Sequence, residues 1–408
     1  MSLPLGLRAL ESRDYRIYYA GNIVSQIGTW MQTISQSWLV LQLTGSPFLL
    51  GLTATLQFGP ILLFSVFAGV LADRLTRRNI LMFTQSVQGT LALLLGLLVW
   101  GGHVRYWQIA IMAVLWGMTS ALDQPTRQSF IMELVGREHL ASAVGMNSAS
   151  FNGARIVGPA VAGLLIARFG VAVAFLLNAL SFVAVLGALV AIRTEGQPAP
   201  GGRLGIREGL RGALSYAAAT PPVAFTLGLL VIVSLLVLNF NVVVPLVAHD
   251  VLHEGAHGFG LLMSSLGAGA VTGAIGLAFF GRERPSLSFL AATAAVLSAG
   301  IMALASIGHF VPAAALLAVL GCVQILFSTG CNTTLQLAAP DALRGRVMGL
   351  YALTFAGMTP FGSLFMGTMA EHFGVRVACA VGGAGGLLAV SVLVLVARRN
   401  LVARPGVI

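Results

Sequence analysis

Arg155 is the charged residue that lies deepest within an apolar stretch of this sequence, twelve residues after the stretch 143–168 begins. In a helix that depth is about 18 Å, and a guanidinium there costs roughly 2.5–3.5 kcal/mol in a bilayer and stays charged. One interpretation is a fixed contact to Asp123 or to amide and carbonyl groups of neighbouring helices. The other is that Arg155 binds an anionic or acceptor-rich ligand group, or responds to a nearby proton site.

Uncharged polar side chains also occur within the apolar stretches. Asn22, Gln26 and Trp30 recur at every fourth residue and therefore share one helix face. The other members of the set are Asn178, Asn239, Asn241 and Gln324. Any one of them could form a helix–helix hydrogen bond, but the set as a whole predicts a moderately polar ligand cavity with aromatic walls.

Other chemistry has little support in the sequence. Three histidines would share a face if their segment were helical, and could then hold a transition metal: His249, His253 and His257. We favour a polar loop and expect no metal. The three cysteines occur in apolar stretches without metal-ligand spacing. No phosphate-binding loop of the Gly-x4-Gly-Lys type occurs, which excludes ATP hydrolysis by this chain.

The composition indicates the elements that must position these residues. Hydrophobic residues make up 57% of the 408 residues and charged residues only 9%, against about 45–50% and 25% in soluble domains. This balance excludes a soluble enzyme, a disordered chain and a disulfide-stapled secreted module. The net charge of +10 comes from scattered arginines, so we expect a lipid bilayer as partner and no nucleic acid.

Runs of about 20 apolar residues predict an all-α membrane protein with twelve transmembrane helices. The predicted spans are 17–42, 48–72, 79–101, 107–123, 143–168, 171–192, 223–247, 258–280, 286–307, 311–333, 347–370 and 375–397. With a cytoplasmic N-terminus, 19 arginines fall inside and 3 outside, which places both termini in the cytoplasm. We expect no cleavable signal peptide, because the first apolar stretch is too long for one, and we expect a multi-pass protein of the inner membrane.

The spans form two halves. We predict an N-terminal six-helix bundle (1–193), a cytoplasmic linker with an amphipathic helix (194–221) and a C-terminal six-helix bundle (222–408). Residues 142–170 match residues 346–374, an offset of 204, with seven identities at 29 ungapped positions. Duplicated six-span bundles with a site between them are typical of transporters.

The loop between spans 2 and 3 carries the first family resemblance. Residues 69–78 read GVLADRLTRR, which resembles the Gly-x-Leu-Ala-Asp-Arg-x-Gly-Arg-Arg loop of the major facilitator superfamily, with Thr76 in place of its second glycine. The loop suits a conformational latch that pins span 2 to the start of span 11. The latch residues are Gly69, Asp73, Arg74, Arg77, Arg78, Arg344 and Arg346.

Span 5 resembles the antiporter motif found in exporters of the same superfamily, with alanine at two of its glycine positions. Small residues at this spacing give a smooth, bent helix face suited to the interface between bundles. The motif residues are Gly145, Ala154, Gly158, Pro159 and Gly163.

Residues 123–130 (DQPTRQSF), 154–160 (ARIVGPA) and 335–350 resemble the enterobactin-exporter-like branch of the drug:proton antiporters. The resemblance spans essentially the whole chain. It implies a monomeric carrier, not an enzyme, that exports amphiphilic drugs or siderophores by alternating access, driven by a proton gradient without a cofactor. Asp123 is then the candidate proton carrier. A lipid or lysolipid flippase of the same fold and a non-transporting membrane sensor remain alternatives.

Overall fold

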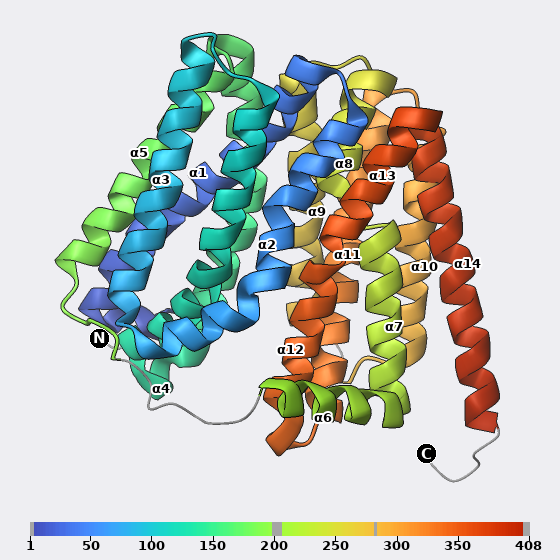
Figure 1. Ribbon diagram of the computed structural model, residues 1–408. Coiled ribbons are helices and arrows are strands. Elements are labelled where there is room, and N and C mark those ends of the chain that lie inside the picture. The colour runs from blue at the N-terminus through green and yellow to red at the C-terminus, as the bar shows by residue number, and fades with distance from the viewer. Residues whose placement is uncertain (1–3, 198–205, 281–283, 403–408) are drawn as a thin grey trace. The chain divides into compact units, whose positions relative to one another are not determined.

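The computed structural model describes residues 4–197, 206–280 and 284–402, and these residues form helices and no strand (Figure 1). The N-terminal elements are the 3-10 helix η1 (Leu5–Glu11), α1 (Arg13–Thr44), α2 (Pro47–Arg74), α3 (Arg77–Trp100), α4 (Tyr106–Phe169) and α5 (Val171–Ala191). The later elements are α6 (Ile206–Ala219), α7 (Pro221–Leu236), α8 (Phe240–Leu246), the π-helix η2 (Val247–Val251), α9 (Ala256–Phe280), α10 (Leu287–Leu304), α11 (Phe310–Ala338), α12 (Asp341–Gly357), α13 (Thr359–Phe373) and α14 (Val375–Val402).

The part of the chain that the structure describes contains ten helical segments long and apolar enough to cross a membrane. Helix α1 is not among the ten, although its 32 residues include the predicted span 17–42. Its many Asn, Gln, Ser and Thr side chains lower its mean hydropathy. Two predicted spans, 107–123 and 143–168, fall within the single 64-residue segment α4.

The structure corrects the predicted end of the fourth span at residue 123. Helix α4 continues through Pro125 to Gly136, where a φ of 70° breaks the helix before its second segment. Glycine tolerates this left-handed conformation because it has no Cβ. The residues after Asp123, which suggested a loop, are helical, and the polar Thr126 and the apolar Phe130 among them are buried.

Two other predicted spans are interrupted. The span 223–247 divides into α7 and α8 at Val237–Asn239, and the span 347–370 divides into α12 and α13 at Met358. Pro360 follows the second break and has no N–H to continue the helical ladder. These breaks expose backbone groups that a continuous helix would satisfy, so polar neighbours are expected there.

The chain folds as two compact units, each of which includes a short segment from the other half of the sequence. Unit 1 comprises residues 1–46, 56–202 and 254–264, and unit 2 comprises residues 47–55, 203–253 and 265–408. In unit 1, α1 and α3 pack against both α4 and α5. In unit 2, α7 packs against α10, α11 and α14.

Glycine contacts show that the two units repeat the same packing. A Cβ on Gly117 of α4 would collide with the carbonyl oxygen of Gln57 in α2, within unit 1. A Cβ on Gly321 of α11 would collide in the same way with the carbonyl oxygen of Leu266 in α9, within unit 2. Gly321 lies 204 residues after Gly117, the offset of the sequence repeat, and Leu266 lies 209 residues after Gln57.

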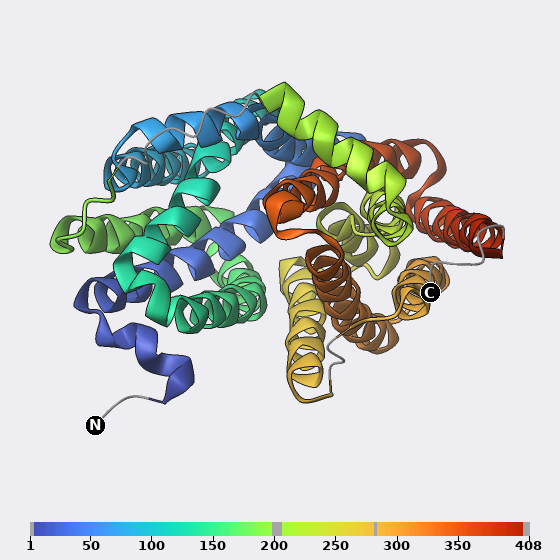
Figure 2. The same cartoon turned by 90° about the horizontal axis from the view of Figure 1, so that it is seen from below.

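Helix α6 coincides with the predicted linker helix and belongs to unit 2. Figure 2 shows it running crosswise, whereas α14 of the same unit is seen nearly end-on. The Tyr216 hydroxyl donates a 2.5 Å hydrogen bond to the carbonyl oxygen of Ala338, at the end of α11, and Ala217 is buried. These contacts attach the linker helix to unit 2.

Candidate functional site

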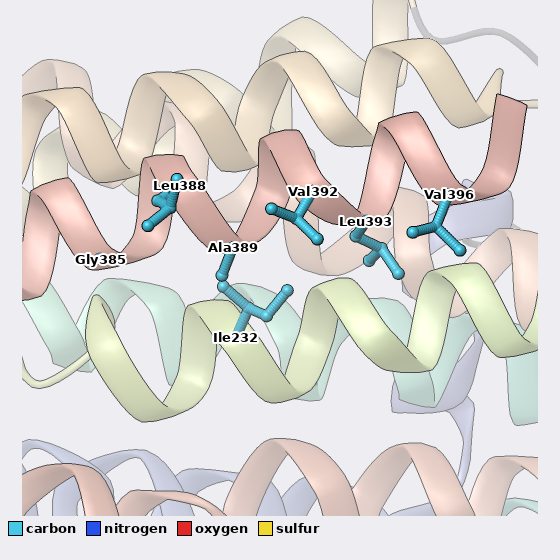
Figure 3. Close-up of a pocket in the computed structure, with 7 residues that line it drawn as sticks. All are labelled: Ile232, Gly385, Leu388, Ala389, Val392, Leu393 and Val396. Atoms are coloured by element: carbon cyan, nitrogen blue, oxygen red, sulfur yellow. The ribbon is translucent and has the colours of Figure 1, made fainter. Parts of the chain in front are cut away.

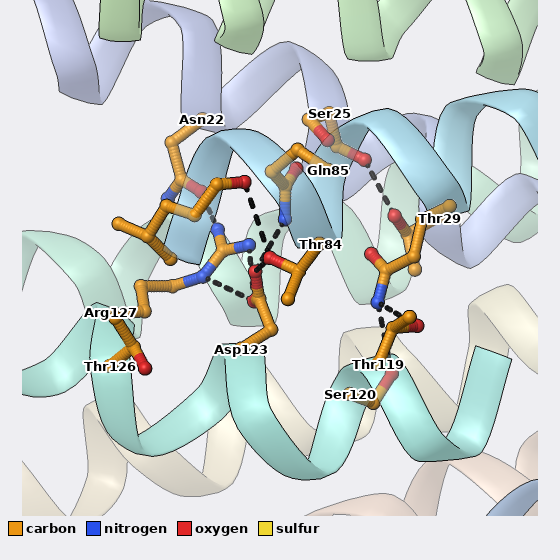
Figure 4. Close-up of polar contacts among 12 residues, drawn as sticks. Asn22, Ser25, Thr29, Thr84, Gln85, Thr119, Ser120, Asp123, Thr126 and Arg127 are labelled. Carbon is orange, nitrogen blue, oxygen red and sulfur yellow. Dashed lines mark hydrogen bonds and ion pairs between the residues drawn. The ribbon is translucent and has the colours of Figure 1, made fainter. Parts of the chain in front are cut away.

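The largest group of buried polar side chains in the described part of unit 1 surrounds Asp123 (Figure 4). Asp123 Oδ1 accepts hydrogen bonds from Thr84 Oγ1 and Gln85 Nε2, both at 2.7 Å. Asp123 Oδ2 accepts two more from Arg127, from Nη2 at 2.7 Å and from Nε at 3.1 Å. Arg127 Nη1 donates in turn to Asn22 Oδ1. The ion pair therefore connects α4 to α3 through the acid and to α1 through the base.

Burial differs across this ion pair. The Asp123 side chain is 7% exposed, and the Arg127 side chain is 20% exposed. Tyr18 lies next to the guanidinium, and its ring packs edge-on against Phe130 at 5.9 Å between centroids. A buried carboxylate with four donor contacts is well satisfied, whereas removing one member would leave an uncompensated charge. The arrangement is stable as a unit and sensitive to any change in its charge.

Arg155 lies in a different environment, on the second segment of α4. Its Cζ is 6.0 Å from the ring centroid of Trp30, within the range of a cation–π contact. Trp30 and Phe151 meet edge-on with centroids 5.6 Å apart, and Phe151 is 47% exposed. Asp123 is paired with Arg127, so the structure favours an aromatic contact for Arg155 over the suggested pair with Asp123.

Gln26 lies one turn of α1 before Trp30 and also faces the second segment of α4. Its Nε2 is 3.5 Å from Asn147 Oδ1, and its Oε1 accepts a 3.3 Å hydrogen bond from Ser150. The predicted face of Asn22, Gln26 and Trp30 therefore exists, and all three side chains contact α4.

Asn178 contacts a different side of α1. Its Nδ2 donates to Gln32 Oε1 at 2.5 Å, and its Oδ1 accepts from Ser181 at 2.9 Å. Asn178 is 1% exposed, and Gly28 leaves no room for a Cβ beside it. These contacts make Asn178 part of the α1–α5 interface, and they do not bring it to the face that carries Gln26 and Trp30.

The predicted cavity residues of unit 2 are more dispersed. Asn239 is buried at the break between α7 and α8, where its Nδ2 donates to the Leu235 carbonyl and Gly362 approaches closely. Asn241 follows in α8 and Gln324 lies in α11, and both are half-buried. An apolar groove of about 420 Å³ between α7 and α14 contains none of these residues (Figure 3).

Residues 6–403 match a family model described as transmembrane secretion effector. The chain belongs to this family of the major facilitator superfamily. The multidrug efflux pump Tap of Mycobacterium tuberculosis is 26% identical over 368 residues, 87% of this chain and 86% of Tap. The enterobactin exporter EntS of Shigella boydii is 25% identical over 399 residues, 96% of this chain and 93% of EntS.

A solved structure shows the same fold. The crystal structure of the POT family transporter PepTSo matches 95% of this chain and 98% of that chain with a TM-score of 0.77 at 14% identity. As a member of the transmembrane secretion effector family, the chain is a multi-pass membrane transporter and not an enzyme.

The latch residues of this family member have contacts within their own units. Arg77 forms an ion pair with Glu133 and donates to the Gln197 carbonyl at 2.6 Å. Arg78 donates to the carbonyls of Leu189 and Val190, at the end of α5.

In unit 2, the latch residue Arg344 donates from Nε to the Gln336 carbonyl at 3.3 Å. Apart from the ion pair, each of these contacts satisfies a backbone carbonyl at or beyond a helix C-terminus.

The other four predicted latch residues are Arg346, Gly69, Asp73 and Arg74. Arg346 lies near Gly212 of α6. The side-chain positions of Gly69, Asp73 and Arg74 lie outside the described residues, so the proposed contact of Asp73 with the start of span 11 stays a prediction.

The antiporter-like motif of this family member packs at two glycines. Gly158 lies against Trp30, and Gly163 lies against Gly260 of α9 within unit 1. Ala154 and Pro159 are buried, whereas a Cβ on Gly145 would meet no other atom within 4 Å.

The histidine segment contains one close pair, His249 Nδ1 and Asp250 Oδ1 at 2.6 Å. Among the described residues, no group of three His, Cys, Asp or Glu side chains could hold a metal ion. The helical course of this segment ends at Val251, and His253 beyond it has a positive φ of 53°.

Asp14, a carboxylate in the first turn of α1, has a shifted pKa. Its Oδ2 accepts hydrogen bonds from Arg193 N, Thr194 N and Thr194 Oγ1 at 2.8–3.0 Å. Burial raises the pKa of Asp14, but the hydrogen bonds from Thr194 and Arg193 outweigh it and hold the pKa below its usual value.

Sequence reasoning missed the partners of Asp123. Arg127 was noted only within the motif DQPTRQSF and as a charge that indicates membrane orientation, and Thr84 and Gln85 had no assigned role. One signal was available, because Arg127 lies four residues after Asp123, the spacing of an ion pair on one helix face. The contribution of α3 had no such signal, because it depends on how two helices rotate against each other.

Proposed function

We propose that this transporter exports amphiphilic small molecules, drugs or siderophores, across the cytoplasmic membrane by proton-coupled alternating access. The names of its relatives Tap and EntS support this class of substrate. The observation that carries the proton-coupling proposal is the buried Asp123–Arg127 ion pair, which links α4 to both α1 and α3.

The proposed topology has twelve crossings with both termini in the cytoplasm. Helix α1 supplies one crossing, and the break at Gly136 divides α4 into two. The excess of arginines on the assigned inner side supports this orientation. In this proposal the chain acts as a monomer and uses the proton gradient, with no ATP or cofactor.

The geometry suggests how a proton would act. Arg127 places both Nη2 and Nε on Asp123 Oδ2, so a proton on Oδ2 would break this bidentate contact. Thr84 and Gln85 would still hold Oδ1, while Arg127 would keep its contact with Asn22 on α1. Proton gain would therefore uncouple α1 from α3, and proton loss would couple them again.

The test uses the purified full chain in proteoliposomes with an imposed pH gradient and ethidium as the transported probe. We expect the gradient to drive ethidium movement in the wild type. Asp123→Asn should abolish gradient-driven movement but retain exchange of ethidium at equal concentrations. Asp250→Asn, which changes an exposed acid, is the matched control. Gradient-driven movement by Asp123→Asn would contradict this role of Asp123, and movement by the wild type that ignores the pH gradient would contradict proton coupling.

A further inference from the structure

Helices α2 and α9 each begin in one unit and continue in the other. Residues 47–55 of α2 belong to unit 2, and the helix continues in unit 1 from residue 56. Residues 256–264 of α9 belong to unit 1, and the helix continues in unit 2 from residue 265. The two segments are 209 positions apart, the offset between Gln57 and Leu266, so they occupy equivalent places in the repeat.

The start of α2 packs closely on α13 within unit 2. A Cβ on Gly51 would collide with the carbonyl oxygen of Ser363 and would lie 3.0 Å from the Cα of Gly367. One turn further along α2, Thr55 Oγ1 lies 2.8 Å from the Pro360 carbonyl oxygen and 2.9 Å from that of Gly51. The backbones of α2 and α13 are therefore in direct contact.

The start of α9 packs in the same way on the second segment of α4, within unit 1. A Cβ on Gly260 would be 2.6 Å from the Pro159 carbonyl oxygen and 2.8 Å from the Cα of Gly163. Ser264 Oγ donates a 3.0 Å hydrogen bond to the Ile156 carbonyl oxygen. Each of these residues lies 209 or 204 positions from its counterpart in the contact between α2 and α13, so the two contacts are equivalent.

One carboxylate distinguishes the two contacts. Glu371 Oε2, on α13, accepts a 3.0 Å hydrogen bond from the backbone N–H of Phe48, in the first turn of α2. A carboxylate at this place satisfies an N–H that has no partner within its own helix, and it faces the positive end of the helix dipole. The equivalent of Glu371 in unit 1 is Ala167, so α4 offers no carboxylate to the start of α9.

Glu371 is the sole carboxylate of α13 and α14, and it is exposed to water. Helices α7 and α8, which pack against α13, carry no titratable group, and those of α2 are Asp73 and Arg74 at its other end. His372 is exposed, and its Nδ1 lies 2.9 Å from the Thr368 carbonyl oxygen of the same helix. The other titratable groups of the elements packed against α13 are Arg376, Cys379, Arg398 and Arg399 of α14, and Asp341, Arg344, Arg346 and Tyr351 of α12.

We propose that Glu371 is a proton-binding site that controls whether the start of α2 stays docked on α13. The charged carboxylate holds the N–H of Phe48 and the positive end of α2, and a proton removes the charge and weakens this hold. Because the hydrogen bond exists only while α2 is docked, release of α2 in turn favours proton binding. The proposal rests on the proposed function, because the proposed topology places this end of α2 on the outer side, where a proton-driven exporter takes up protons.

The test is hydrogen–deuterium exchange of the purified full chain in detergent, with peptides that resolve residues 47–55 and 256–264. Exchange is measured from about pH 7.5 to about pH 4.5, a range in which carboxyl groups take up protons, and is corrected for the intrinsic rate at each pH. Glu371→Gln keeps an acceptor oxygen but loses the charge. It should lower the protection of 47–55 about tenfold at the highest pH, the range of one hydrogen bond to a charged group. The wild type should approach the variant as the pH falls.

The internal control is the segment 256–264, whose protection should not change with Glu371→Gln. Glu254→Gln is the matched control variant, because Glu254 precedes α9 and lies against Gly258 of that helix, and it should leave 47–55 unchanged. If Glu371→Gln does not fold, the pH profile of the wild type still decides, since a loss at low pH confined to 47–55 supports the site and an equal change in both segments overturns it.

Two results for Glu371→Gln would overturn the proton-binding site. One is unchanged protection of 47–55, and the other is a loss that stays the same at every pH, because the hydrogen bond would then be structural only. The assay needs neither substrate nor a proton gradient. Transport that ignores the pH gradient would therefore contradict proton coupling and leave the Glu371 site standing, whereas gradient-driven transport without the pH-dependent protection would overturn the site alone.

Discussion

Unit 1 and unit 2 repeat their backbone packing but fill the equivalent core positions differently. Gly117 and Gly321 each admit a carbonyl of a neighbouring helix at the same place in the repeat. At the 204-residue offset, Asp123 of unit 1 corresponds to Phe327 of unit 2, which is fully buried. Arg127 corresponds to Cys331, also fully buried. An ion pair in one unit thus takes the place of two uncharged side chains in the other.

The threonine hydroxyls of α3 and α10 also differ between the two units. The Thr84 hydroxyl lies 2.7 Å from Asp123 Oδ1 and 3.2 Å from the Leu81 carbonyl oxygen of its own helix. Thr293, 209 residues later, donates to the carbonyls of Phe289 and Leu290 in its own helix. The bond to the backbone thus recurs in both units, and the bond to a carboxylate is added in unit 1. The comparison indicates that the repeat preserves close helix approach, while the ion pair at these core positions belongs to unit 1.

The largest expected effect comes from breaking the ion pair on one side only. Arg127→Leu should lower the free energy of unfolding in detergent by about 3–5 kcal/mol, because Asp123 would stay buried without its counter-ion. The equivalent change in unit 2, Cys331→Leu, alters packing but leaves no charge unpaired. Thermal or denaturant unfolding of both variants measures the difference.

The double variant Asp123→Leu/Arg127→Leu is the control for charge. It should lose less stability than Arg127→Leu alone, since removing both partners leaves no buried ion. If the double variant is less stable than Arg127→Leu, the loss of stability comes from packing around α4. The difference between the two units would then not be due to the buried charge of Asp123.

Glycine substitutions should affect both units alike. Gly117→Ala and Gly321→Ala each place a methyl group against a backbone carbonyl, and each should cost about 1–3 kcal/mol of unfolding free energy. Gly145→Ala and Gly349→Ala, another pair at the 204-residue offset, would place the methyl group where no other atom lies within 4 Å, and should be neutral or slightly stabilising. Unequal losses for Gly117 and Gly321 would show that the two units are not packed alike.

The smallest effect concerns the charged contact at the start of α1. Asp14→Asn should cost about 1 kcal/mol at pH 7, because it weakens the hydrogen bonds with Arg193 and Thr194. Since the pKa of Asp14 is lowered in the folded protein, its stabilisation is complete above the usual carboxyl pKa of about 4 and is lost as the pH falls through the lowered value.

The measurement for Asp14 is the stability difference between the wild type and Asp14→Asn as a function of pH. The residue 209 positions later in unit 2 is the buried Val223, and the loss from Val223→Ala should not depend on pH. A stability difference for Asp14→Asn that persists unchanged at acidic pH would contradict the role of its charge.

The sequence alone predicted the helical membrane architecture and the internal repeat. Long apolar runs have few alternatives in lipid, because only helices satisfy every backbone group within one segment or closed barrels do so between strands. The repeat was visible because glycines such as Gly158 and Gly362 occupy places where a neighbouring helix leaves no room for a Cβ. The face of Asn22, Gln26 and Trp30 was also predictable, because it depends only on the period of one helix.

Tertiary structure decided which polar groups meet. The pairing of Asp123 with Arg127 required α4 to continue past residue 123, and the apparent loop sequence DQPTRQS pointed the other way. The contacts with Thr84 and Gln85 depend on how α3 and α4 rotate and slide against each other. Helical period places a side chain on a face of its own helix, but the facing residue of the neighbour is set by packing over both helices, which no local spacing contains.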